Sequence, residues 1–79
     1  MDSISCVVLR FNNPVDGTPV ETLHSCWRDL SRAEGMKDKM NQYHAHEGLC
    51  YSVESREVLS RRIGICEEVL IGNSWLTVS

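Results

Sequence analysis

Residues 3–11 are rich in apolar and β-branched types, so both faces of a strand formed by this segment would be largely apolar. One face carries Ile4, Cys6 and Val8, and the other carries Val7, Leu9 and Phe11. A strand with two apolar faces is typical of the centre of a sheet rather than of its edge. The sequence Asn-Asn-Pro at residues 12–14 then predicts the end of the strand.

The next segment carries the most specific helix-start pattern in the chain. Thr18 is suited to cap a helix, Pro19 to its first position and Glu21 to complete a capping box. Apolar residues then recur at steps of three and four: Leu23, Cys26, Trp27, Leu30, Ala33, Met36, Met40 and Tyr43. This spacing predicts a long amphipathic helix over roughly residues 19–45, with a kink or break near Gly35.

The remainder of the chain favours strands. Leu49, Tyr51 and Val53 alternate with polar residues as in a half-buried strand. Residues 63–71 also fit a strand, and Gly-Asn at 72–73 predicts a hairpin turn into a last strand. Residues 55–62 fit either a short helix or a polar connection, and the pattern does not decide between them.

The order strand, long helix, strand, uncertain link and hairpin predicts the α+β class. We expect a single domain over residues 1–79, a two-layer sandwich with one long amphipathic helix on a mostly antiparallel sheet of three to four strands (β-α-β-β-β). A chain of 79 residues can bury one modest core but leaves little room for a deep catalytic cavity. We therefore expect no enzyme activity and no cofactor.

Charge and cellular location add further expectations. Eleven Asp and Glu against eight Lys and Arg give a net charge of -3, which disfavours affinity based on neutralising phosphates. The first residues do not resemble a secretion signal, and the longest apolar run, residues 6–9, is far too short to span a bilayer. We expect a cytoplasmic protein without a membrane partner.

The chain has four cysteines: Cys6, Cys26, Cys50 and Cys66. None forms a C-x-x-C pair, so the spacing encodes neither a zinc ribbon nor a thioredoxin-like redox motif. All four have apolar neighbours, which predicts buried thiols that act as small hydrophobic side chains.

Histidines and cysteines also form a weak candidate metal set: His24, Cys26, His44, His46 and Cys50. On a helix, His24 and Cys26 would point away from each other and could not share one ion. His44 and His46 are better explained as groups that cap the C-terminal end of the predicted helix. A zinc site at His44, His46 and Cys50 stays as an alternative.

Basic residues form a stripe on the predicted helix, opposite its apolar face: His24, Arg28, Arg32 and Lys39. We interpret Arg28, Arg32 and Lys39 as charged anchors for a partner, because arginine is enriched at protein interfaces. Trp75, near the end of the chain, is the candidate apolar anchor. An ordinary solvated helix face and a contact with nucleic acid are the competing interpretations.

These features favour a non-enzymatic, stoichiometric protein-binding regulator or inhibitor that acts by covering the surface of another protein. Small acidic proteins of this type are common among phage and mobile-element products that antagonise host nucleases or defence complexes. A homodimer, with salt bridges at the Glu67–Glu68 pair, is a further hypothesis for the partner. The alternatives are a nucleic-acid-binding or transcription-regulating domain, disfavoured by the acidity, and a small zinc-binding domain.

Overall fold

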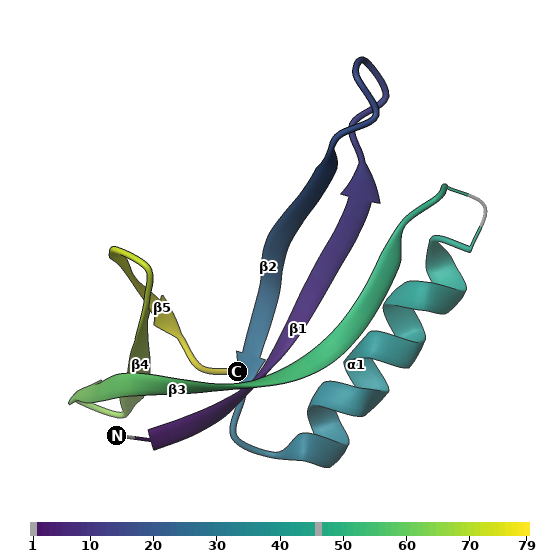
Figure 1. The fold of residues 1–79 in the computed structure, drawn as a ribbon. Helices are drawn as coiled ribbons and strands as arrows, with labels where there is room; N and C mark the ends of the chain where they lie inside the picture. The colour runs from purple at the N-terminus through teal and green to yellow at the C-terminus, as the bar shows by residue number, and fades with distance from the viewer. Residues whose placement is uncertain (1, 46) are drawn as a thin grey trace.

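The computed structural model describes residues 2–45 and 47–79, which form five β-strands and one α-helix (Figure 1). The elements are β1 (Asp2–Asn12), β2 (Pro19–Trp27), α1 (Leu30–Tyr43), β3 (Cys50–Ile63), β4 (Cys66–Ile71) and β5 (Ser74–Thr77). The strands form one antiparallel sheet in the order β2-β1-β3-β4-β5. The α+β class is confirmed, but the sheet has five strands rather than three or four, and a second strand precedes the helix.

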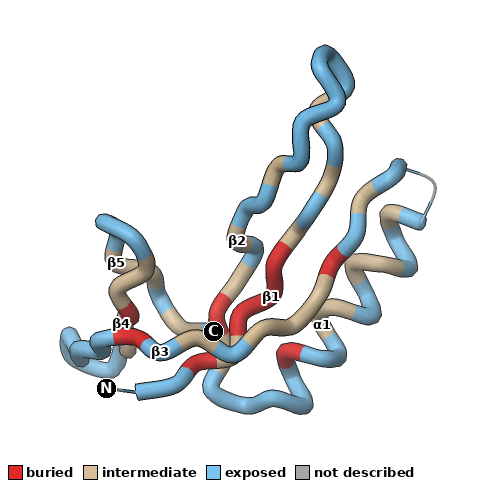
Figure 2. Tube along the Cα trace, viewed as in Figure 1, coloured by how far each residue is buried: buried red, intermediate tan, exposed pale blue. Residues whose placement is uncertain are grey.

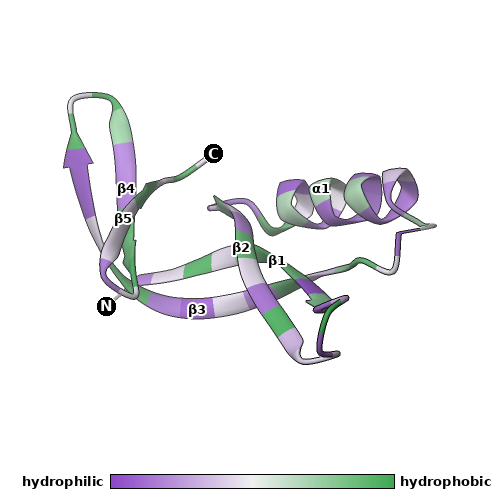
Figure 3. Cartoon of the chain, turned by 90° about the horizontal axis from the view of Figure 1, so that it is seen from above, coloured by the Kyte–Doolittle hydropathy of each residue, from purple (hydrophilic) through white to green (hydrophobic). Residues whose placement is uncertain are grey.

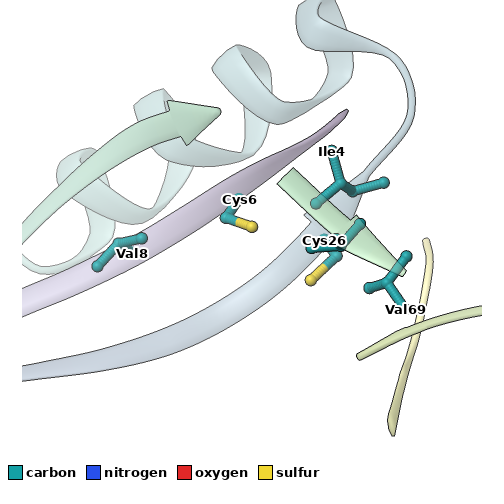
Figure 4. Close-up of a cluster of buried hydrophobic side chains, with 6 residues drawn as sticks. Ile4, Cys6, Val8, Cys26 and Val69 are labelled. Atoms are coloured by element: carbon teal, nitrogen blue, oxygen red, sulfur yellow. The ribbon is translucent and has the colours of Figure 1, made fainter. Parts of the chain in front are cut away.

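β1 lies in the interior of the sheet, between β2 and β3, as its two apolar faces predicted. One face contributes to a cluster that we call the inner core, formed by Ile4, Cys6, Val8, Cys26, Val58 and Val69 (Figure 4). The other face contributes Val7 to the helix core, where it meets Ala33 and Tyr51 beneath α1. Figure 3 shows α1 along one side of the sheet only, and Figure 2 shows buried segments in β1, β2, β3, β4 and α1, whereas most of the β1–β2 loop is exposed.

The long strand β3 belongs to both halves of the sheet. Its first part pairs with β1, up to the pair Asp2–Val58, and residues 59–63 pair with β4. The sheet therefore curls, and the β4–β5 hairpin packs Val69 and its neighbours against the inner core. The curl also brings the end of the chain to β2, where the backbone N–H of Ser79 donates to the carbonyl of Cys26 at 2.8 Å (Figure 1).

The prediction of a helix is wrong for residues 19–27, because this segment forms the strand β2. The hydroxyl of Thr18 donates to the Asp16 carboxylate at 2.7 Å, and its carbonyl accepts from the N–H of Asn13 at 2.8 Å. Thr18 therefore closes the β1–β2 loop instead of capping a helix. Pro19 is the first residue of an edge strand, a position where the missing N–H removes no bond of the sheet.

A β-bulge in β2 explains the misleading helical spacing. Val7 lies opposite Ser25 but Val8 lies opposite Leu23, so His24 is an extra residue in the ladder. Leu23 and Cys26 consequently face the inner core together, although residues three apart in a regular strand face opposite sides. The bulge thus reproduces the three-residue step of a helix in an extended chain.

The helix α1 begins at a different cap. The carboxylate of Asp29 accepts from the backbone N–H of Ser31 at 2.9 Å, which satisfies one of the free donors at the helix start. α1 then runs without interruption through Gly35, so the predicted break is wrong. His44 occupies the C-cap position, but its backbone N–H, and not its ring as predicted, bonds to the carbonyl of Met40 at 3.0 Å.

Residues 55–62, which the sequence left undecided, continue β3 as an extended strand. The segment predicted as one strand over residues 63–71 is divided by a two-residue turn at Gly64 and Ile65. Gly64 has φ 62° and Gly72, in the predicted final hairpin, has φ 63°. Glycine at the first turn position is the usual way to join strands with a two-residue loop of this hand.

Candidate functional site

The predicted basic stripe does not exist as one helix face. His24 is in β2, Arg28 lies in the link that follows, and only Arg32 and Lys39 are on α1. The structure therefore separates the charged anchors that the sequence grouped together. Their contribution to partner binding stays a prediction for each residue by itself.

Arg28 connects three parts of the chain. Its guanidinium donates to both carboxylate oxygens of Glu67, at 2.9 and 2.6 Å, and to the Asp2 carboxylate at 3.0 Å. It also donates to the carbonyl of Ser3 at 3.0 Å. Hydrogen bonds from Ser60 and Arg28 lower the pKa of Asp2, and the bonds from Arg28 lower the pKa of Glu67. Arg28 thus ties the β2–α1 link to β1 and β4.

Arg32 and Lys39 are seven residues apart and so share one exposed face of α1. The Arg32 side chain is 74% exposed, and its nitrogen lies 3.9 Å from the nearest oxygen of Asp29. The ammonium of Lys39 lies 5.9 Å from the centre of the exposed Tyr43 ring. These two residues keep the charged face that the sequence predicted, reduced to half its length.

A second surface is apolar and lies on the outer face of the curled sheet, beyond the helix. Cross-strand pairs put Ile63 beside Cys66, Leu59 beside Leu70, and Leu70 beside Trp75 on this face. Leu59 is 53% exposed, Ile63 is 56% exposed, and Ile65 in the adjoining turn is 95% exposed. We call this surface the outer patch: Leu59, Arg61, Ile63, Ile65, Cys66, Glu68, Leu70 and Trp75.

One ion pair lies in the middle of the outer patch. The guanidinium of Arg61 donates to the Glu68 carboxylate at 2.9 Å and lies 4.0 Å from the centre of the Trp75 ring. The position of Arg61 over the Trp75 ring is that of a cation–π contact, and Glu68 neutralises the charge of Arg61. The patch therefore has large apolar side chains around a locally neutral centre, and it contains the predicted apolar anchor Trp75, which is half-buried.

The sequence contained a signal for this patch that its interpretation missed. Leu59, Arg61 and Ile63 occupy every second position, which is the period of a strand face. Residues 55–62 were undecided because their polar residues obscure this alternation. Leu59, Arg61 and Ile63 all belong to the outer patch, together with Ile65 in the turn that follows.

The inner face beyond the inner core carries a closed network of four charges. Arg10 pairs with Glu21 and Glu54, and Arg56 pairs with the same two carboxylates. Hydrogen bonds from Arg56 lower the pKa of Glu21, and those from Arg10 lower the pKa of Glu54. Because each charge has two opposite neighbours, the network stabilises the pairing of β2, β1 and β3.

Only part of the cysteine prediction is confirmed. Cys6 and Cys26 are buried opposite each other in the inner core, whereas Cys50 and Cys66 are exposed (Figure 4). Burial raises the pKa of Cys6 and raises the pKa of Cys26 to about 12. Cys50 and Cys66 lie at the starts of β3 and β4, where their apolar neighbours do not cover them.

The structure describes four of the five candidate metal ligands, His24, Cys26, His44 and Cys50. Among residues 2–45 and 47–79, no group of three or more His, Cys, Asp or Glu side chains is placed to hold an ion. His44 Nδ1 lies 2.8 Å from the Glu47 carboxylate, and His24 Nδ1 lies 2.9 Å from the hydroxyl of Ser25. The alternative zinc site also included His46, with His44 and Cys50, and His46 lies outside the described residues.

Within the described residues, no helix is long and apolar enough to cross a membrane. Comparisons of the chain with protein-family models, curated proteins and solved structures found no match.

Proposed function

We propose that the chain is a non-enzymatic, stoichiometric protein-binding regulator that covers a partner's surface with its outer patch. The observation that carries this proposal is the exposure of Leu59 and Ile63 on one face of the β3–β4 hairpin and of Ile65 in its turn. Large apolar residues clustered around a half-buried tryptophan are the usual anchors of protein interfaces. The patch replaces the basic helix stripe as the main contact, and Trp75 keeps its proposed role.

The local electrostatics indicate the chemistry of the partner. Arg61 and Glu68 neutralise each other, so the centre of the patch attracts neither a strongly acidic nor a strongly basic surface. A partner surface of aliphatic and aromatic side chains, with hydrogen-bonding groups at its margin, complements it best. Such an interface responds weakly to salt, in contrast to the steep salt dependence of phosphate binding.

The test is affinity capture from lysate of the native host, followed by reconstitution of the captured complex from purified components. We expect a 1:1 complex with the wild-type chain, and at least a roughly tenfold weaker complex with an Ile63→Glu, Ile65→Glu variant. The matched control is Val15→Glu, because Val15 is 92% exposed but lies alone in the β1–β2 loop.

Two results would contradict the proposal. The first is equal binding by the Ile63→Glu, Ile65→Glu variant and the Val15→Glu control. The second is a partner whose affinity falls steeply with salt, which would indicate a nucleic acid or a strongly charged surface instead. Both variants change exposed side chains, so their thermal midpoints are expected to stay close to that of the wild type.

A further inference from the structure

The two edge strands of the sheet run in the same direction. β2, β1, β3, β4 and β5 are each antiparallel to the next, so β2 and β5 are parallel to each other. The curl brings these edges together at one end, where Ser79 bonds to Cys26 (Figure 1). One strand added between β2 and β5 would be antiparallel to both. The strand directions would then alternate around the whole curled sheet.

Within residues 2–45 and 47–79, β5 has backbone groups without a partner that could pair with such a strand. The N–H of Val78 donates to the carbonyl of Glu67, and bonds to one neighbour come from every second residue of an antiparallel strand. The backbone N–H and C=O groups of Leu76 therefore point to β4, whereas those of Trp75 and Thr77 point to the open edge. The N–H of Ser79, two residues after Thr77, bonds away from β4 to the carbonyl of Cys26, as this alternation of bonding directions requires.

The open edge of β5 is short, but it lacks two other common protections against strand addition, a charged side chain and a proline. β5 has the sequence Ser-Trp-Leu-Thr, without a charged residue or a proline. A groove of about 170 Å³ separates it from β2, and none of its lining residues is Lys, Arg, Asp or Glu: Leu23, His24, Ser25, Cys26, Leu76, Thr77 and Ser79. Leu23, Leu76 and Val78 are only partly buried and pack against the inner core below.

We propose that the partner supplies an uncharged, extended segment that enters this groove and pairs antiparallel with β5. This inference rests on the proposed protein-binding function and names the form of the partner. Alternate side chains of the segment would pack on Leu23 and Leu76, so they are apolar. The others would extend the outer face beside Trp75, which makes the added strand continuous with the outer patch.

The probe is a displayed library of random nine-residue peptides, selected on the full chain and resynthesised with a fluorescent label. We expect selected peptides to carry apolar residues at alternate positions and to lack charges between them. Their binding should slow hydrogen exchange at the amides of Trp75 and Thr77. In the free chain these two amides should exchange faster than the paired amide of Leu76.

Thr77→Pro removes the outward N–H without touching the bonds to β4, and should weaken peptide binding roughly tenfold. Thr77→Val is the matched control, because it keeps the N–H, and its affinity should stay within about twofold of the wild type. If the proline variant fails to fold, ligation at Cys66 of a synthetic segment over residues 66–79 allows N-methylation of Thr77 alone.

Failure to select peptides, peptides without alternation, unprotected amides, or equal binding by the proline variant would each overturn strand addition. The two proposals fail separately. Loss of the captured host partner on Ile63→Glu, Ile65→Glu substitution but not on Thr77→Pro substitution would leave the outer patch and remove the strand. The reverse result would remove the patch and leave the strand.

Discussion

The side chain of Asn41 in α1 acts as a strand neighbour for Tyr51 in β3. Its amide N–H donates to the carbonyl of Tyr51 at 3.0 Å, and its carbonyl accepts from the N–H of Tyr51 at 2.8 Å. β4 pairs only with residues 59–63 of β3, so this part of the edge has no adjacent strand within the described chain. The helix therefore closes one edge of the sheet, whereas the edge of β5 stays open.

Asn41→Ala should lower the free energy of unfolding by about 1–3 kcal/mol, because both backbone groups of Tyr51 lose a partly buried partner. Urea unfolding followed by far-UV circular dichroism measures the change. Gln42→Ala, at the exposed neighbouring position, is the control and should change stability by less than about 0.5 kcal/mol. Equal effects of the two substitutions would show that the paired hydrogen bonds contribute nothing specific.

Arg28→Gln should lower the thermal midpoint by on the order of 5 °C at neutral pH, because it removes the bonds to Glu67, Asp2 and Ser3. Arg32→Gln is the control, since that side chain is 74% exposed and its ion pair is long. The control should stay within about 1 °C of the wild type. If Arg28→Gln behaves as the control does, Arg28 is not a structural link and its role as a partner anchor gains weight.

The same pair of chains should differ in acid sensitivity. The folded state lowers the pKa of Asp2 and of Glu67 below their ordinary values of 3.8 and 4.5. Carboxylates with lowered pKa values stabilise the fold above those ordinary values, and this stabilisation is lost as the pH falls through the folded-state values. The stability gap between wild type and Arg28→Gln should therefore be full at neutral pH and shrink below about pH 4. A gap that stays constant down to about pH 2 would contradict the assignment.

Thiol titration should divide the four cysteines into two pairs. Cys50 and Cys66 are exposed and should react quickly with an aromatic disulfide reagent in the folded chain. Cys6 and Cys26 should react only after unfolding, because burial excludes the reagent and raises both pKa values, that of Cys26 to about 12. Cys50→Ser and Cys66→Ser should each remove one fast equivalent, and four fast equivalents in the native wild type would show that the inner core is open.

Ile4→Ala should destabilise the chain by about 2–5 kcal/mol, because Ile4 is only 2% exposed and its removal leaves a cavity in the inner core. Val15→Ala, at an exposed loop position, is the control and should change the unfolding free energy by less than about 0.5 kcal/mol. A loss below about 1 kcal/mol for Ile4→Ala would indicate that the β4–β5 hairpin does not pack on β1 in solution.

The first strand, the α+β class and the final hairpin could be predicted from local pattern alone. Residues 3–11 have the two apolar faces that an interior strand requires, and the Gly-Asn turn is a local signal. β2 could not be predicted in the same way, because the His24 bulge gave Leu23 and Cys26 the spacing of a helix face. The proposed helix cap at Thr18 failed because the same residue types also close loops.

The candidate site depended on contacts that no local pattern contains. Arg28 and Glu67 are far apart in the sequence, and only the curl of β3 brings them together. Their pairing occupies one of the three basic residues that were predicted to contact a partner. Trp75 could be chosen from its residue type, but its neighbours in the outer patch follow from the pairing of β3 with β4.

The long-range pairing of β1 with β3 has a consequence for how the chain folds. Asp2 pairs with Val58, and Val69 completes the inner core. Neither the β1–β3 pairing nor the inner core can therefore form until these later residues have been synthesised. β1 and β2 can form a hairpin early, but an isolated hairpin is marginal in water. A topology rich in such distant contacts folds slowly, and cooperative structure should appear only after β4 has left the ribosome.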